Sequence, residues 1–252
     1  MIVIKTAAEF EKMKAAGKVV AGALKLLGEQ VRPGVTTKEL DTAAREYIES
    51  CGAVPTFLGY GGYPASVCIS INEQVIHGIP GKRVIRDGDV VSCDIGATLD
   101  GFVGDAARTF IAGTAAEEDT RLVEVTKQCF FEALPYCRPG YRISDISRAV
   151  QTYAEKNGYG VVRDYVGHGI GRKMHEEPEV PNYFTPMARR RLHAGMAICI
   201  EPMIDQGTWQ VKVLPDGWTV VTADGKKSAH YENTVLITED APILTTAYEE
   251  GL

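Results

Sequence analysis

The sequence has little of what marks several classes of protein. Its six cysteines show no C-x-x-C spacing. The opening segment MIVIKTAAEFEKMK has no signal-peptide core, and no apolar run is long enough to cross a bilayer. Low-complexity segments are missing as well. These absences predict a cytoplasmic globular protein with reduced thiols and no membrane partner.

Positive charge is also scarce. The chain has 27 Lys and Arg against 33 Asp and Glu, a net charge of −6, whereas neutralising phosphates requires a basic surface. This balance argues against DNA or general nucleic-acid binding. The local exception is ARRRLH, residues 188–193. This run could touch RNA or a ribosome, but a solvated charge run is the interpretation that we favour.

Helix signals open the chain. Thr6-x-x-Glu9 is a capping box that predicts a helix start, and Arg-Pro-Gly at 32–34 predicts where that helix stops. Thr36-x-x-Glu39 predicts a second start, and Gly52 is placed to end that helix.

The same order of signals returns about 106 positions later. Arg-Pro-Gly at 32–34 is matched at 138–140, each before a helical run, and GDVVSCD (88–94) corresponds to GMAICIE (195–201). Two unrelated helix–turn–helix pieces are the alternative to a duplication. The common offset favours the duplication, which implies two similar α+β halves.

We therefore expect an α+β fold in one catalytic domain, residues 1–252. The two halves of the duplication would span approximately 1–115 and 116–252 and lie face to face.

A β-hairpin with acidic side chains is predicted over residues 89–113. Asp100-Gly101 is a strong signal for a two-residue turn, and with that turn position 94 faces 107 while 96 faces 105. Asp94 and Asp105 then become diagonal neighbours on one face, roughly 7–8 Å apart. Two inward carboxylates at this distance repel each other unless a cation lies between them. The hairpin thus predicts a divalent-cation site.

The second half supplies matching acids and an imidazole. Glu201 lies in AICIEPM, Glu232 lies in AHYENTVLIT, and His168 lies in the glycine-rich run GHGIG. Any one of these acids alone would be interpreted as a surface carboxylate. Four carboxylates in corresponding order with one imidazole can hold two divalent ions. This donor set is too rich in oxygen for a structural zinc site.

With His77 in NEQVIHGIPG, these residues resemble the type I methionine aminopeptidases in their short bacterial form. The resemblance runs over nearly the whole chain. It implies the pita-bread fold, in which two pseudo-symmetric halves with antiparallel sheet enclose a dinuclear metal site. It also implies an enzyme that removes the initiator methionine from nascent proteins when the second residue is small.

The resemblance implies roles for individual residues. The metal ligands would be Asp94, Asp105, His168, Glu201 and Glu232. They would hold two divalent ions, which could be Co, Mn, Fe or Zn, and a family site for a monovalent cation would lie at Asn72, Gln74 and Ser228. The catalytic residues besides the metals would be His77, His175 and Glu201, with both histidines contacting the substrate.

The methionine pocket would be formed by Tyr60, Tyr63, Cys68 and Trp218. Phe57 and Met174 also belong to this substrate-binding set, but they depart from the small or thiol residue and the aromatic residue common at their positions. Of the remaining histidines, His193 is expected to be exposed. His230 is expected on the face of Glu232, at the rim of the site or beside the ligands.

The expected partner is the N-terminal peptide of a nascent protein at the ribosome, bound by a monomer. An X-Pro aminopeptidase or prolidase would share the fold and ligands but usually carries an additional N-terminal domain. A non-catalytic pita-bread binding module would have lost metal ligands, whereas all five are present here.

Overall fold

Four α-helices flank a set of short sheets in the computed structural model, which describes residues 2–247. The helices are α1 (Ala7–Gln30), α2 (Thr37–Ser50), α3 (Glu117–Ala133) and α4 (Ile143–Lys156). The strands of the first half are β1 (Val54–Pro55), β2 (Cys68–Ile71), β3 (Gln74–Ile76), β4 (Val90–Leu99) and β5 (Phe102–Ile111). Those of the second half are β6 (Gly160–Val161), β7 (Gly167–Gly169), β8 (Glu176–Val180), β9 (Ala197–Ile200), β10 (Met203–Asp205), β11 (Val211–Val213), β12 (Val220–Thr222), β13 (Ser228–His230), β14 (Asn233–Leu236) and β15 (Ile243–Leu244). Among the described residues, no helix is long and apolar enough to cross a membrane.

The predicted helix boundaries are confirmed. At the start of α1, the Thr6 hydroxyl accepts from the Glu9 N–H, and the Glu9 carboxylate accepts from the Thr6 N–H. The box predicted at Thr36 caps α2 in the same way. Gly52 follows the last turn of α2 with a φ of 74°, a left-handed conformation that glycine adopts at little cost.

The β4–β5 hairpin also has the predicted register. Asp94 faces Ala107 and Gly96 faces Asp105, as the turn at Asp100-Gly101 requires. Both turn residues have positive φ, 50° and 77°, as a two-residue turn of this kind demands. The register places Asp94 and Asp105 on the same face of the hairpin.

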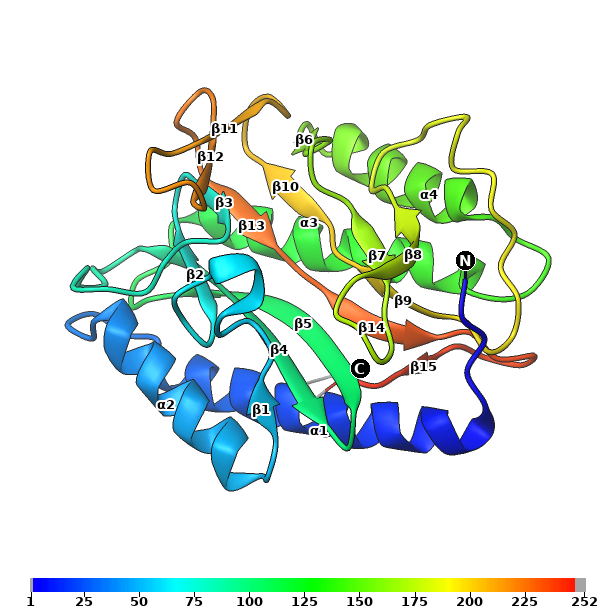
Figure 1. Ribbon diagram of the computed structural model, residues 1–252. Helices are drawn as coiled ribbons and strands as arrows, with labels where there is room; N and C mark the ends of the chain where they lie inside the picture. The colour runs from blue at the N-terminus through cyan, green and yellow to red at the C-terminus, as the bar shows by residue number, and fades with distance from the viewer. Residues whose placement is uncertain (1, 248–252) are drawn as a thin grey trace.

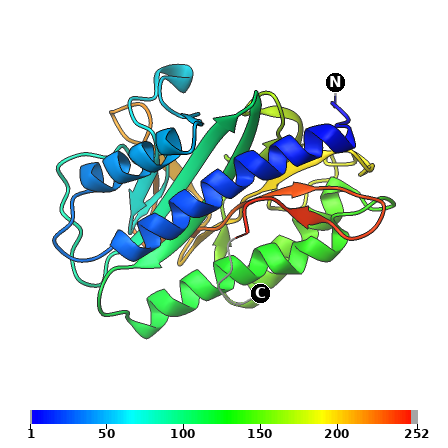
Figure 2. The same ribbon diagram turned by 90° about the horizontal axis from the view of Figure 1, so that it is seen from below.

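In each half, helices lie against one side of the strands (Figure 1), and an apolar core fills the space between them. In the first half, α1 and α2 pack on β2, β4 and β5, and in the second half α3 and α4 pack on β9, β10 and β14. From below, α1 is seen crossing β4 and β5, while α3 covers the second half (Figure 2). The helices therefore lie outside, and the inner faces of the sheets are left for the site.

The two halves correspond position by position. Helix α4 begins and ends 106 residues after α2. Gly34 and Gly140 have φ values of 94° and 97°, and Gly88 and Gly195 have values of 80° and 89°. These correspondences support the predicted duplication, which stays a prediction.

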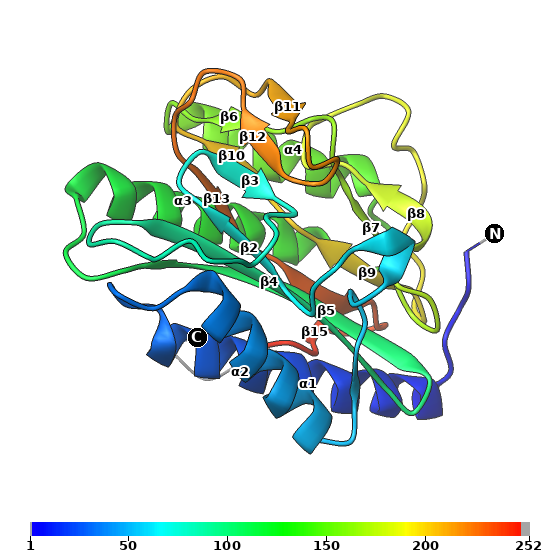
Figure 3. The ribbon, with the colours of Figure 1, turned by 60° about the vertical axis from the view of Figure 1, so that its left-hand side comes forward.

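The halves meet along β5, which lies beside β13 and β14 (Figure 3). Ala107 and Glu232 exchange main-chain hydrogen bonds of 3.4 and 3.0 Å. On either side, a threonine hydroxyl replaces main-chain pairing: Thr234 bonds the main chain of Asp105, and Thr109 bonds that of His230. This seam brings acids from both halves to one place.

Candidate metal centre and active-site pocket

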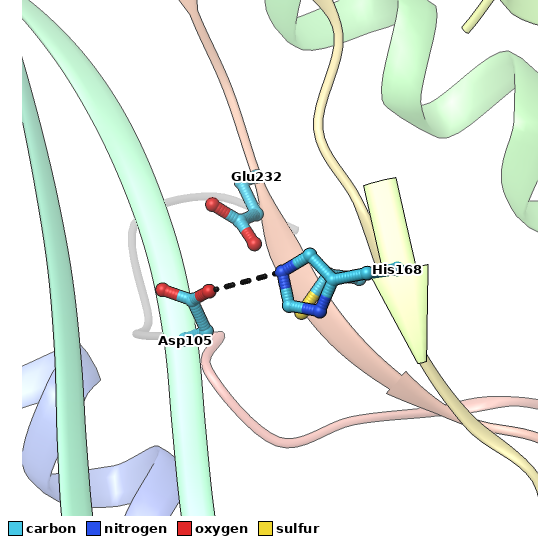
Figure 4. Close-up of side chains that lie close together, drawn as sticks. Asp105, His168 and Glu232 are labelled. Atoms are coloured by element: carbon cyan, nitrogen blue, oxygen red, sulfur yellow. Dashed lines mark ion pairs between the residues drawn. The ribbon is translucent and has the colours of Figure 1, made fainter. Parts of the chain in front are cut away.

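The predicted ligands come from five positions of the two sheets. Asp94 lies on β4, Asp105 on β5 and His168 on β7. Glu201 follows β9 and Glu232 precedes β14, next to the paired residues Ile200 and Asn233. Asp105, His168 and Glu232 come from separate segments and point toward one another (Figure 4).

His168 is oriented for ligation. Its Nδ1 lies 2.8 Å from the carbonyl oxygen of Gly169, and because a carbonyl only accepts, Nδ1 carries the proton. The Nε2 lone pair therefore faces the acids, 3.5 Å from Asp105 Oδ2 and 3.6 Å from Glu201 Oε1. A main-chain carbonyl that fixes the imidazole tautomer is the usual support of a metal-binding histidine.

Four carboxylates lie together in the cluster. Asp105 and Glu232 are buried, and Asp94 and Glu201 are partly exposed. Burial raises the pKa of Asp105 to about 8. Burial, and then the neighbouring carboxylates, raise the pKa values of Asp94, Glu201 and Glu232 well above their ordinary range. Each of these four residues also has one buried carboxylate oxygen without a hydrogen-bond partner. Buried charges of one sign require a counter-ion, so the residues present fit divalent cations.

Cys199 is a neighbour of the cluster that the sequence interpretation missed. Potential ligand atoms of Asp105, His168, Cys199 and Glu232 lie within 4.8 Å of one another. Burial, followed by the charge of Glu232, raises the pKa of the thiol well above its usual value, which disfavours the thiolate form that binds metals. Strand alternation from Glu201 places Cys199 on the same side of β9 and was the available signal.

A cavity of about 200 Å³ opens beside the acids. Its wall contains all the predicted site residues and Gly61: Phe57, Tyr60, Gly61, Tyr63, Cys68, His77, Asp94, Asp105, His168, Met174, His175, Glu201, Trp218 and Glu232. The structure thus brings the predicted metal, catalytic and pocket residues into one cavity.

The apolar wall of the cavity is held in place by specific contacts. The Tyr63 hydroxyl donates to the carbonyl of Gly78 at 2.9 Å, and its ring meets Trp218 edge-on at 5.1 Å. A Cβ at Gly96 would lie 2.6 Å from the Phe57 ring. Gly96, which the sequence interpretation did not single out, therefore makes room for Phe57.

His77 and His175 flank the acids as neutral groups. Burial lowers the pKa of His77 to about 4, and partial desolvation lowers the pKa of the more exposed His175 to about 4 as well. Nδ1 of His175 lies 2.7 Å from the Tyr60 hydroxyl, and the ring lies 4.3 Å from that of His168. His77 has a positive φ of 59° and contacts the Trp218 ring edge-on. At neutral pH, both imidazoles can donate or accept one hydrogen bond without bringing a charge.

The other two histidines differ from each other. His193 is exposed, as predicted. His230 is almost fully buried, so a place at the rim is wrong, but it does lie beside a ligand, with Nε2 3.8 Å from Glu232 Oε2. Burial lowers its pKa to about 3.

The residues predicted for a monovalent cation have their side chains engaged elsewhere. The Asn72 amide bonds Asp89 and Val90, and Gln74 Oε1 accepts from the main chain. The Ser228 hydroxyl donates to the Ile204 carbonyl at 3.3 Å, and the Ser228 N–H donates to the Asn72 carbonyl at 2.9 Å. A cation at this place would depend on main-chain oxygens, and the site stays a prediction.

Comparison with known proteins places this fold and site in a class of metal-dependent peptidases. The profile of metallopeptidase family M24 matches residues 11–239, and the chain belongs to this family.

The relatives narrow the class further. The chain is 53% identical to a methionine aminopeptidase from Clostridium acetobutylicum, over 99% of this chain and 100% of that protein. The structure of a methionine aminopeptidase from Thermotoga maritima superposes with a TM-score of 0.96 at 46% identity, covering 98% of this chain and 100% of that one. These matches confirm the resemblance to methionine aminopeptidases.

A prolidase from Pyrococcus furiosus shares the fold at a TM-score of 0.78 and 24% identity, with 98% of this chain and 66% of that chain covered. The predicted α+β pita-bread fold is therefore confirmed.

Proposed function

We propose that the protein is a methionine aminopeptidase, which removes the initiator methionine from nascent proteins when the second residue is small. The observation that carries the proposal is the single cavity in which an acidic cluster with one imidazole adjoins an apolar pocket. The cluster suits a metal-dependent hydrolysis, and the pocket suits an unbranched side chain.

Two divalent ions are the cofactors that we infer, with Asp94, Asp105, His168, Glu201 and Glu232 as ligands. Asp105 and Glu232 would contribute ligands from opposite halves of the molecule. When bound, such ions lower the pKa of water and polarise a carbonyl. Mn, Fe, Co and Zn all suit oxygen donors with one imidazole, and the cellular supply decides among them.

The chain's own residues would then orient the substrate and move the proton. Neutral His175 would donate a hydrogen bond to the scissile carbonyl, where negative charge develops. His77 would bond the scissile nitrogen. Glu201 would take a proton from the attacking water and pass it to the leaving amine, which is the work of a positioned general base and acid.

The methionine side chain would enter the apolar end of the cavity. Tyr63, Cys68 and Trp218 offer aromatic and thiol surface to a thioether, which makes favourable contacts with ring edges. Phe57 and Met174 would close the end of this pocket. Because the described chain supplies every residue of the site, a monomer suffices, and its substrate would be the nascent chain at the ribosome.

The experiment compares two peptides. We expect the protein, with added Mn or Co, to release methionine from Met-Ala-Ser and to leave an X-Pro peptide intact. Release of the first residue from X-Pro alone would replace the proposal with an X-Pro aminopeptidase. Binding of either peptide without turnover would indicate a binding module.

A further inference from the structure

A buried lysine lies behind the loop that carries His175. Lys5 donates from Nζ to Glu176 Oε2 at 2.8 Å, and the two side chains are only 2% and 9% exposed. Lysine is almost never this buried unless it is paired. Glu176 directly follows His175, so the ion pair lies one residue from the imidazole.

The same carboxylate also closes the loop. Oε1 of Glu176 accepts from the main-chain N–H groups of Arg172 at 2.9 Å and Lys173 at 3.2 Å. A Cβ at Gly171 would lie 2.6 Å from Lys5 Cε and 2.8 Å from Glu176 Oε1. The loop 171–176 is therefore folded around the ion pair, and its first residue leaves no room for a side chain.

Lys5 is itself fixed to the second half. Its main-chain N–H donates to the carbonyl of Gly195 at 2.7 Å, just before the capping box that starts α1. Gly195 has a φ of 89°, and a Cβ there would lie 2.4 Å from the Ile4 side chain. The segment before α1 is thus docked on the protein by both its main chain and its one buried charge.

We propose that Lys5 is a positioning residue for His175 and acts through Glu176. The ion pair holds the loop from behind, while the Tyr60 hydroxyl holds Nδ1 of His175 from the side of the pocket. This inference rests on the proposed role of His175 at the scissile carbonyl.

Loss of the lysine should affect rate and spare metal binding. Without Lys5, the Glu176 carboxylate stays buried with no cation beside it, so it moves toward water. The loop and His175 then move with it. Four of the five proposed metal ligands lie on other segments. The fifth, His168, lies on β7, which pairs with β9 as well as with β8, so the metal site stays in place. A misplacement of about 1 Å can lower a rate on the order of 10²-fold.

The test uses the full chain with Mn and follows kcat and KM for Met-Ala-Ser. The variants are Lys5→Met, Glu176→Gln, His175→Ala and the double variant Lys5→Met/His175→Ala. Lys14→Met is the matched control, because Lys14 forms an ion pair of similar length, 2.7 Å, with Glu11 in a more exposed setting. Metal affinity and amide hydrogen exchange of residues 171–176 are measured beside the rates.

We expect Lys5→Met to lower kcat about 10²-fold, with little change in KM or metal affinity, and to speed exchange in the loop. Lys14→Met should change neither kcat nor the exchange rate of the loop. In the His175→Ala background, Lys5→Met should have almost no further effect, because two residues that act as a unit are not additive.

Two results would overturn the inference and leave the proposed function intact. One is a Lys5→Met rate within a few-fold of wild type. The other is a double variant whose loss in kcat equals the product of the losses in the two single variants. An unimpaired His175→Ala enzyme would instead contradict the role given to His175. If Lys5→Met does not fold, Glu176→Gln takes its place in the same double-variant comparison with the same expectations.

Discussion

The main-chain N–H of Asp105 donates to the hydroxyl of Thr234 at 3.1 Å, and that hydroxyl donates to the Asp105 carbonyl at 2.9 Å. The two residues belong to different halves of the molecule. Because Asp105 and Glu232, which is two residues from Thr234, are both proposed metal ligands, this hydroxyl fixes the spacing of ligands from opposite halves.

Replacing Thr234 by Val should therefore weaken metal binding. Valine keeps the shape but leaves the buried main chain of Asp105 without its partner. Removal of groups that support metal ligands typically costs about 10–100-fold in affinity, and we expect a loss in that range by calorimetric titration with Mn. Thr234→Ser, which keeps the hydroxyl, should restore most of it.

Thr109→Val is the control for this prediction. Thr109 makes the corresponding pair of bonds with His230, at 2.8 and 2.9 Å, but it does not bond the main chain of a ligand. We expect lower stability with a smaller change in metal affinity. Equal losses of affinity in Thr109→Val and Thr234→Val would show that the whole seam, rather than the Thr234 hydroxyl, sets the site.

The histidines should separate by role. His168→Ala removes the only imidazole ligand that we propose and should lower metal content. His77→Ala and His175→Ala should keep metal and lose rate, and exposed His193→Ala should change neither. Metal content measured beside kcat for the four variants checks this; uniform metal loss would mean that the roles are misassigned.

Asp205 predicts a pH-dependent stability outside the metal centre. It is fully buried on β10, and burial raises its pKa from 3.8 to about 8. Between these values the folded protein holds a proton that the unfolded chain has released. The free energy of unfolding should thus fall as pH rises through this window, by at most about 1.4 kcal/mol per pH unit from this group.

Asp205→Asn removes this titration. The variant should gain stability over wild type as pH rises from 5 to 8, and the gain should level off above pH 8. Urea unfolding of both proteins at several pH values measures the difference in their free energies of unfolding. Groups that titrate alike in both proteins cancel in this difference. A constant difference across the range would show that Asp205 is ionised in the folded protein.

The pocket should favour methionine over leucine at the first position. The difference in activation free energy, taken from the ratio of the two kcat/KM values, should be about 1–3 kcal/mol, which is what the shape of an apolar pocket can discriminate. Phe57→Ala enlarges the pocket and should reduce that preference, whereas Phe184→Ala, at an exposed ring stacked by Arg148, should leave it unchanged. The measurement is kcat/KM for Met-Ala and Leu-Ala peptides. No change in the ratio for Phe57→Ala would place the methionine side chain elsewhere.

Local signals in the sequence predicted the parts of the fold that depend on near neighbours. The capping boxes set the starts of α1 and α2, and Asp100-Gly101 set the register that puts Asp94 and Asp105 on one face. Each of these features depends on a few adjacent residues, whose conformational preferences are visible in the chain itself.

Features that depend on packing between distant segments could not be predicted in this way. Lys5 pairs with Glu176 across 171 positions, and Thr234 bonds Asp105 across 129. Nothing in the sequence beside Lys5 or Thr234 indicates these distant partners. The burial of His230 is a similar case. Strand alternation predicted that its side chain lies on the same face as Glu232, but it did not predict that this side chain is almost fully buried.

The most direct test of the account is metal titration of the stripped protein. Chelated and dialysed protein should show no release of methionine from Met-Ala-Ser, and added Mn or Co should restore the rate. Glu201→Gln, which keeps the shape but loses charge and basicity, should stay at least about 10²-fold slower at saturating metal. Full activity in a preparation shown to be free of metal, or a Glu201→Gln rate within a few-fold of wild type, would contradict it.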